Sequence, residues 1–207
     1  MNRPTPIDDG SFREDERLGR LAASAARGDR DAAAGLLRGV QDAVYRFALA
    51  QLGCREAAAD AAQETARRLL TAVRTRRGDS RVTTWALGVT RNVCREHRRR
   101  QARRSAAGEA TAQLAELPSR ESPVGSRVEQ DEQAARLRAA IATLPERQRE
   151  AVVLRHLECL SVAETASVMG CSEGTVKASH WQAIRRLRTE LAADTQDEPT
   201  ERREPVP

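Results

Sequence analysis

Aromatic side chains are scarce in this 207-residue chain, which contains two Trp, one Tyr and two Phe. Strands favour β-branched and aromatic residues, so the composition argues against an all-β fold. Alanine and arginine are abundant instead, and both lose little conformational freedom in a helix. We therefore expect an all-α protein, and the chain length suits two small helical domains with modest cores.

Long apolar runs are also missing. No stretch of about 18 apolar residues is present, which argues against a transmembrane helix, and the first twenty residues lack the apolar core of a secretory signal. We therefore expect a cytoplasmic protein. Its four cysteines have no paired spacing, and we expect reduced, mostly buried thiols: Cys54, Cys94, Cys159 and Cys171.

Lysine is nearly absent, because Lys177 is the only one and arginine carries the basic charge. The net charge is +5, and the segment 91–104 (RNVCREHRRRQARR) alone has seven arginines and one glutamate. Clustered arginines attract phosphate, and such binding weakens steeply with salt. The segment therefore indicates a nucleic-acid contact, with a solvated arginine-rich helix face as the alternative.

Changes in composition divide the chain into five segments. Pro, Gly, Ser and charged residues dominate both ends and one internal stretch, whereas apolar residues recur at helical spacing in between. We expect disordered tails, two helical domains and a flexible linker, with the limits 1–15 (tail), 16–104 (domain), 105–129 (linker), 130–193 (domain) and 194–207 (tail).

Capping and turn signals in the second domain predict a helix-turn-helix. Ser161 and Glu164 have the spacing of a capping box, and this short helix is expected to stop at Gly170. Ser172 can cap the next, longer helix. In a helix-turn-helix, the first turn of the second helix approaches base edges, while its N-terminus and Lys177 can bind phosphate.

Three segments in this order resemble a known family. They are ADAAQETARRLL (59–70), RGDSRVTTWALGVTRNVCREHRRR (77–100) and LPERQREAVVLRHLECLSVAETASVMGCSEGTVK (144–177). They are similar to the region two signature, the promoter-melting and minus-ten-reading segment, and region four of bacterial sigma-70 factors, in particular the extracytoplasmic-function group. The resemblance covers about 16–193 and implies a two-domain initiation factor that acts by binding.

The resemblance implies roles for the matching positions. Polymerase binding, at the clamp helices of the β′ subunit, would involve Asp60, Gln63 and Glu64. The minus-ten strand would be held by Arg76, Arg77, Asp79, Ser80, Arg91, Asn92, Arg95, Arg98 and Arg99. The minus-thirty-five duplex would be approached by Ser172, Glu173, Gly174, Thr175, Lys177, Ser179 and His180. Asn92 is expected to hold an unpaired base, and Trp85 is expected to be mainly a core residue.

The resemblance also implies partners. These are core RNA polymerase (β′ clamp helices and β flap), promoter DNA and an anti-sigma factor; no cofactor, metal or small-molecule substrate is implied. Two departures bear on promoter choice. Arg76 stands where the family often has an aromatic before RGDS, and 178–182 lacks two expected cationic contacts. His180 can replace one of them when protonated, but is expected to be neutral near pH 7.

Other functions have weaker support. A zinc site would use ligand types present in the second domain, but their order departs from that of zinc fingers: His156, Cys159, Cys171 and His180. An enzyme would need a nucleophile motif or a Gly-rich phosphate loop, and neither is recognisable. A stand-alone helix-turn-helix regulator explains the second domain but leaves DAAQET and the arginine-rich helix without a role.

Overall fold

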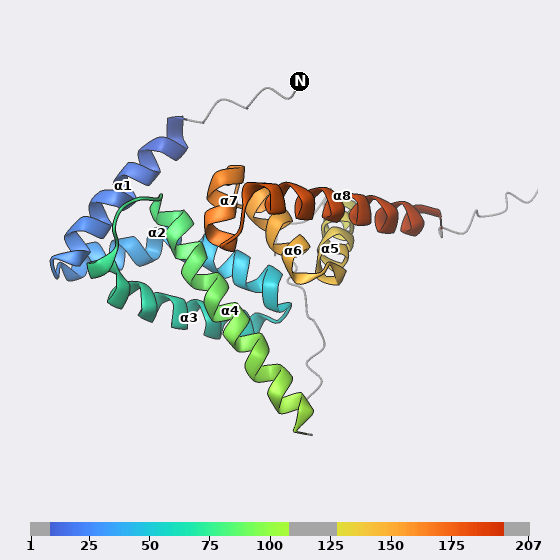
Figure 1. The fold of residues 1–207 in the computed structure, drawn as a ribbon, viewed down its shortest axis with the longest axis horizontal. Helices are drawn as coiled ribbons and strands as arrows, with labels where there is room; N and C mark the ends of the chain where they lie inside the picture. Colours follow the sequence, from blue (N-terminus) through green and yellow to red (C-terminus); the bar gives the residue numbers. More distant parts are fainter. Residues whose placement is uncertain (1–8, 108–127, 197–207) are drawn as a thin grey trace, which may run out of the picture.

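The computed structural model describes residues 9–107 and 128–196, and the regular structure in these residues is helical, as the composition predicts (Figure 1). The N-terminal domain (9–107) contains α1 (Asp9–Ala26), α2 (Arg30–Leu52), α3 (Arg55–Ala72), the 3₁₀ helix η1 (Val73–Thr75) and α4 (Val82–Ala106). The C-terminal domain (128–196) contains α5 (Val128–Thr143), α6 (Glu146–Val152), the π-helix η2 (Val153–Leu157), α7 (Val162–Met169) and α8 (Glu173–Gln196).

The helices extend past the domain limits expected from the sequence. Helix α1 begins at Asp9, so the predicted tail 1–15 is wrong for its second half, and α8 continues to Gln196. Charge pairs at helical spacing support α1, because Arg17 contacts Glu14 and Arg20 contacts Glu16. The rest of the predicted tails and most of the predicted linker (1–8, 108–127 and 197–207) lie outside the described residues.

Small residues let the N-terminal helices pack closely. Leu18 of α1, Leu36 of α2 and Leu69 of α3 are almost fully buried in one apolar cluster. At Gly39, a Cβ atom would lie 2.3 Å from the Cδ2 atom of Leu18, closer than two carbon atoms can approach. Glycine at position 39 therefore allows α1 to pack closely against α2. A larger residue there would force the two helices apart.

The predicted helix-turn-helix is confirmed in the C-terminal domain. The backbone N–H of Glu164 donates to Ser161 Oγ at 3.1 Å, and the Ser161 N–H donates to Glu164 Oε2 at 2.8 Å, which completes the capping box. Gly170 ends α7 at φ 59°, in the left-handed conformation that glycine tolerates. Ser172 then accepts the Thr175 N–H at 3.2 Å and begins α8.

The two domains pack against each other, which the sequence did not predict. Figure 1 shows α7 beside the first half of α4, while the second half of α4 projects away from the body. The main apolar cluster of the C-terminal domain also contains Ala43 and Phe47 of α2 and Leu87 of α4. The flexible linker expected from the sequence therefore joins domains that share a core.

Candidate nucleic-acid interface

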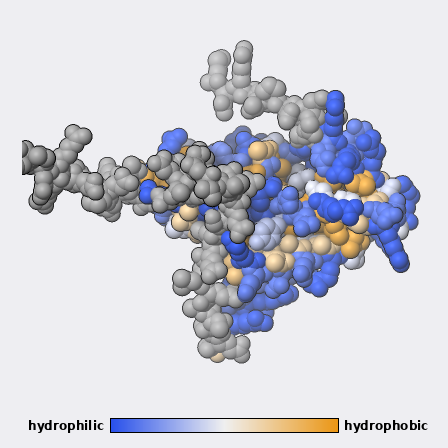
Figure 2. Space-filling view, turned by 180° about the vertical axis from the view of Figure 1, so that it is seen from behind, coloured by the Kyte–Doolittle hydropathy of each residue, from blue (hydrophilic) through white to orange (hydrophobic). Residues whose placement is uncertain are grey.

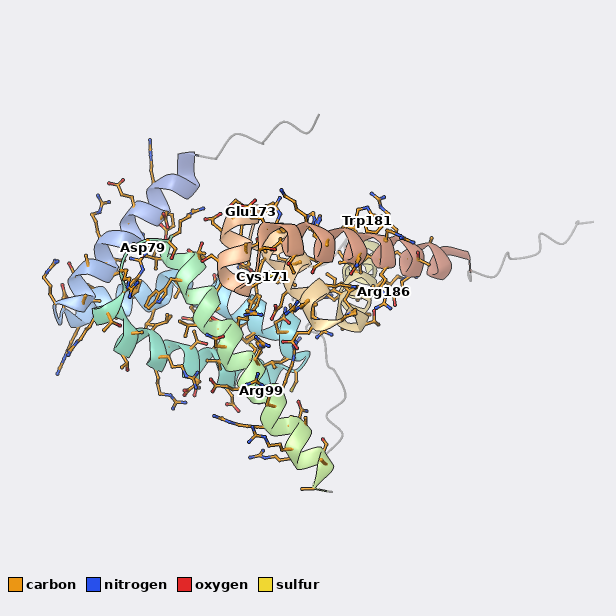
Figure 3. The ribbon with its side chains drawn as sticks, viewed as in Figure 1. Asp79, Arg99, Cys171, Glu173, Trp181 and Arg186 are labelled. Atoms are coloured by element: carbon orange, nitrogen blue, oxygen red, sulfur yellow. The ribbon has the colours of Figure 1, made fainter. Side chains whose placement is uncertain are left out.

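Helix α4 carries the arginine-rich segment from the interior of the molecule to its surface. Arg91 is only 9% exposed, whereas the next residue, Asn92, is exposed. Two turns later Arg99 is exposed as well, on the part of α4 that leaves the body (Figure 3). The arginine-rich segment therefore has two parts. The C-terminal domain covers Arg91 in the first part, and the second part is basic and exposed.

Arg91 forms a buried ion pair with the C-terminal domain. Its Nε donates to Oε1 of Glu150 at 2.8 Å, and Glu150 is 1% exposed. Burial raises the pKa of Glu150, while the hydrogen bond and positive charge of Arg91 act in the opposite direction. The second carboxyl oxygen, Oε2, is buried without a hydrogen-bond partner in the described residues, which costs about 1–3 kcal/mol.

Two further arginines of the predicted minus-ten set face the same domain. Arg95 Nε lies 3.6 Å and Arg98 Nη1 lies 3.1 Å from the same oxygen of Glu146. Arg98 also donates to the side-chain oxygen of Gln51 at 2.9 Å. The structure therefore separates the predicted minus-ten residues: Arg91, Arg95 and Arg98 contact carboxylates of the C-terminal domain, while Asn92 and Arg99 face solvent.

The loop before α4 holds the next members of the predicted set. The guanidinium of Arg76 lies over the Trp85 ring at 5.7 Å and donates to the Ser80 carbonyl. Arg77 and Asp79 are exposed, the latter in the loop beside α1 in Figure 3. Trp85 is half-buried against the N-terminal core, which confirms that it is mainly a core residue. Arg76 therefore already lies over an aromatic ring of its own chain.

The residues predicted to bind polymerase lie together on α3. Asp60 and Gln63 are exposed, and with Glu64 they line a groove of about 510 Å³ between α3 and α4. Glu64 accepts from both Arg67 and Arg68, and these hydrogen bonds, that of Arg68 first, hold its pKa below the usual value.

A second, more apolar groove adjoins the first at Gln63. It lies between α2 and α3, and its lining includes Val40, Val44, Ala62 and Leu69. Figure 2 shows apolar residues reaching the surface over the N-terminal domain. Gln63 thus joins the groove that holds Asp60 and Glu64 to an apolar depression, a combination that suits docking of a helix with basic and apolar side chains.

The start of α8 presents most of the predicted minus-thirty-five set to solvent. Ser172, Glu173, Gly174 and Lys177 are exposed, and Thr175 is half-buried with its Oγ1 2.9 Å from Ser172 Oγ. Ser179 differs, because it lies three residues after buried Val176 and four before buried Ala183. It is 8% exposed and belongs to the packed face of α8.

His180 contacts another histidine. Its Nε2 lies 2.8 Å from Nε2 of His156, and the two rings stack with their centroids 5.0 Å apart. Burial, followed by the nearby His156 and Arg155, lowers the pKa of His180. The histidine is therefore neutral near pH 7, as expected from its ordinary pKa, and it offers a hydrogen bond rather than a positive charge.

Sequence reasoning missed Trp181 as a surface residue of this helix. Its side chain is 59% exposed on α8, and the guanidinium of Arg185 lies over the ring at 4.8 Å (Figure 3). Trp181 follows Lys177 by four residues, which places both on one helix face. The four-residue spacing from Lys177, in a chain with only two tryptophans, could have indicated from the sequence that Trp181 lies on the exposed face of this helix.

The cysteines depart from expectation. Only Cys94 is buried, and burial raises its pKa to about 12. Cys159 is exposed in the tight turn before α7, at φ 53°, and Cys54 and Cys171 are half-buried. Mostly buried thiols were therefore the wrong prediction, because Cys159 serves a turn and not a core.

The candidate zinc set is not brought together in the structure. Within 9–107 and 128–196, no three side chains of His, Cys, Asp or Glu are grouped as metal ligands, and His156 and His180 are the pair that meets. Over the same residues, none of the helices combines the length and the hydropathy needed to cross a bilayer.

Two family models match the chain, one in each domain. The model described as sigma-70 region 2 matches residues 36–104, and the one described as sigma-70 region 4 matches residues 134–187. The chain belongs to the extracytoplasmic-function sigma factors of the sigma-70 family. It is therefore a transcription initiation factor, a non-enzymatic subunit of RNA polymerase, with region 2 in the N-terminal domain and region 4 in the C-terminal domain.

Curated sigma factors align with this one over most of its length. It is 33% identical to the sigma factor SigD of Mycobacterium tuberculosis H37Rv over 189 residues, which cover 86% of this chain and 85% of SigD. It is also 33% identical to BldN of Streptomyces coelicolor over 180 residues, covering 86% of this chain and 67% of BldN.

Two solved structures share the fold. One is RpoE in complex with the anti-sigma factor NepR from Bartonella quintana, with a TM-score of 0.62 and 23% identity, covering 75% of this chain and 93% of RpoE. The other is CnrH in complex with the cytosolic domain of CnrY, with a TM-score of 0.64 and 23% identity, covering 87% of this chain and 99% of CnrH.

Proposed function

We propose that this sigma factor docks on the β′ clamp helices of core RNA polymerase through α3, holds the minus-ten strand with α4 and its preceding loop, and contacts the minus-thirty-five duplex with α8. The β flap is the proposed partner of region 4. The observation that carries the proposal is that the three residue sets lie on three separate helices, and that the side chains of each set suit its proposed partner.

The docking part rests on α3. Asp60, Gln63 and Glu64 lie within little more than one helical turn and line a groove of mixed charge between α3 and α4, and Gln63 also lines the apolar groove between α2 and α3. Acidic and amide groups can pair with basic side chains of a partner helix, and the apolar groove supplies area that is removed from water.

The minus-ten part rests on Asn92. Its amide both donates and accepts, it is exposed, and the basic end of α4 follows it. A base held out of the stack cannot re-pair, so an amide that binds one base together with arginines on the backbone would stabilise the open strand.

The minus-thirty-five part rests on the first turn of α8. Its N-terminus attracts phosphate, and Lys177 adds a positive charge on the exposed face. A Cβ atom at Gly174 would meet only Ser172 Oγ, at 3.8 Å, an ordinary contact. The fold does not require glycine there, whereas close approach of a DNA backbone does. Trp181 extends this face and can contact a thymine methyl group.

Regulation and location follow from the same proposal. An anti-sigma factor is the expected inhibitor, since the similar fold of RpoE was solved with the anti-sigma factor NepR bound and that of CnrH with the cytosolic domain of CnrY bound. A polymerase subunit acts where the chromosome lies, so we place this sigma factor in the cytoplasm. Free protein should bind promoter duplex weakly, because each small domain offers few contacts.

Run-off transcription with purified core RNA polymerase and a genomic promoter library tests the proposal. Wild-type protein should yield discrete transcripts that core polymerase alone does not. Asn92→Ala should abolish or strongly reduce them, while Thr71→Ala, which changes an exposed polar residue without an assigned role, should not. Equal activity of both variants would overturn the role of Asn92.

Polymerase docking needs its own control. The triple variant Asp60→Ala/Gln63→Ala/Glu64→Ala should lose binding to core polymerase, measured by fluorescence anisotropy. The double variant Glu14→Ala/Glu16→Ala also removes two negative charges, but from α1, and should bind normally. Unchanged binding of the triple variant would move docking away from α3. Nanomolar promoter binding without polymerase would instead support a stand-alone regulator.

A further inference from the structure

We propose that region 4 acts as an intramolecular competitor of promoter DNA: in the free protein its carboxylates occupy the α4 arginines that otherwise bind the minus-ten strand. The inference rests on the proposed DNA role of those arginines. It concerns this chain alone and names region 4, through Glu146 and Glu150, as the group that must leave before Arg91, Arg95 and Arg98 meet phosphate.

Charge pairs cross the interface at several points. Arg91 meets Glu150 in a buried pair, and Arg95 and Arg98 share Glu146. On α2, Arg46 donates to both oxygens of Glu158, at 3.1 and 2.9 Å, and the Glu158 side chain is 3% exposed. In these ion pairs region 2 contributes the cations and region 4 the anions, the same polarity as protein and DNA.

Apolar contacts hold the same surfaces together. Phe47 and Leu87, each fully buried, come from region 2 but lie in the cluster formed by region 4 side chains. Thr84 of α4 also donates to Glu164 of α7 at 3.4 Å, which brings the helix-turn-helix against the start of α4. In this closed arrangement, with region 4 packed on region 2, apolar contacts and a hydrogen bond therefore hold region 4 against α4, where Arg91 is covered.

The interface also has a feature that favours opening. In the described residues, Glu150 leaves one buried carboxyl oxygen without a hydrogen-bond partner. In the open protein, water can donate to this oxygen and a DNA phosphate can accept from Arg91, so neither group lacks a partner. Asp60 and Gln63 remain exposed on α3 in the closed state. Polymerase can therefore dock on the closed protein, and the exchange of carboxylate for phosphate at Arg91 can follow docking.

The variant Glu150→Gln tests this inference in the free, full-length protein. It removes the negative charge and keeps the side-chain size, so closure would bury Arg91 without a counter-charge and opening becomes favourable. The control Glu16→Gln removes one exposed negative charge from α1 and changes the net charge equally. Two readouts are needed: the radius of gyration by small-angle X-ray scattering, and binding of a fluorescein-labelled 20-nucleotide single-stranded DNA of mixed sequence.

The expected result is a larger radius of gyration and about fivefold tighter DNA binding for Glu150→Gln than for Glu16→Gln. The slope of log affinity against log salt should steepen by about 0.7 for each arginine released. If Glu150→Gln does not fold, as judged by circular dichroism, Glu146→Gln at the exposed end of the interface should give the same changes at smaller size.

Two outcomes overturn the inference and are distinguishable. An unchanged radius together with unchanged binding shows that the ion pairs do not hold the closed state. A larger radius with DNA binding equal to that of Glu16→Gln shows that the domains open but the uncovered arginines do not bind DNA. In the second case the failure lies in the DNA role proposed for Arg91, and not in the closure.

Discussion

Regions 2 and 4 hold their predicted DNA-binding residues in different states. In region 4, the first turn of α8 presents Glu173, Gly174 and Lys177 to solvent. In region 2, Arg91, Arg95 and Arg98 contact carboxylates of the other domain. The first turn of α8 is therefore exposed in the free protein, whereas part of the predicted minus-ten surface is covered.

Helices α7 and α8 of region 4 begin differently from α3 and α4 of region 2. In region 4, Ser161 caps α7 with a full capping box and Ser172 bonds to the first turn of α8. In region 2, the N-cap residues of α3 and α4 are Cys54 and Arg81, and neither makes a side-chain cap bond. The start of short α7 therefore depends on local hydrogen bonds, whereas α3 and α4 depend on packing.

The largest expected effect comes from the core that the regions share. Phe47→Ala should lower the free energy of unfolding by about 3–5 kcal/mol, because it empties a fully buried site against region 4. Urea denaturation followed by circular dichroism measures this loss. Phe47→Ala should also increase the radius of gyration, because it weakens the contact between the regions. Leu36→Ala, within the region 2 cluster, is the matched control and should not increase it. A loss below about 1 kcal/mol for Phe47→Ala would mean that the regions do not share a core.

The capping difference gives the next effect. Ser161→Ala should cost about 1 kcal/mol, since it leaves the Glu164 N–H without its acceptor at the start of α7. Cys54→Ala at the start of α3 should change stability by less than about 0.5 kcal/mol, because Cys54 makes no cap bond. Thermal denaturation of the two variants compares them directly, and equal losses would contradict the difference.

A smaller effect concerns the exposed recognition helix. Lys177→Ala should weaken holoenzyme binding to promoter duplex about threefold and reduce the salt slope by about 0.9, the loss of one phosphate contact. Lys177→Arg keeps the charge and should restore the slope. Filter binding over a range of salt concentrations measures both quantities, and a slope that stays the same for Lys177→Ala would remove Lys177 from the interface.

The smallest effect is chemical and leaves stability unchanged. At pH 8, Ellman's reagent should modify exposed Cys159 fast and Cys94 only after unfolding, because burial raises the Cys94 pKa to about 12. Single Cys→Ser variants at the two positions assign the fast and slow phases. A fast Cys94 would indicate that α4 separates readily from its neighbours.

Local signals predicted much of the fold and of region 4. The capping box at Ser161, the turn at Gly170 and the cap at Ser172 involve residues a few positions apart, so their spacing is visible in the sequence. The Arg91–Glu150 pair joins residues 59 positions apart, and no periodicity reports such a contact. The burial of Ser179 was missed for a different reason: its phase on α8 was available but was outweighed by the family pattern.

The sequence by itself determined the helices, the family and the chemistry of each surface, because helix propensity, capping and charge depend on neighbouring residues. Only the tertiary structure decided which of these surfaces are free. Apolar and charged side chains from distant segments meet between α2, α4, α6 and α7, and their burial couples the two regions. That arrangement is a property of three-dimensional packing, and it turns the arginine-rich segment of α4 into a surface that is partly covered.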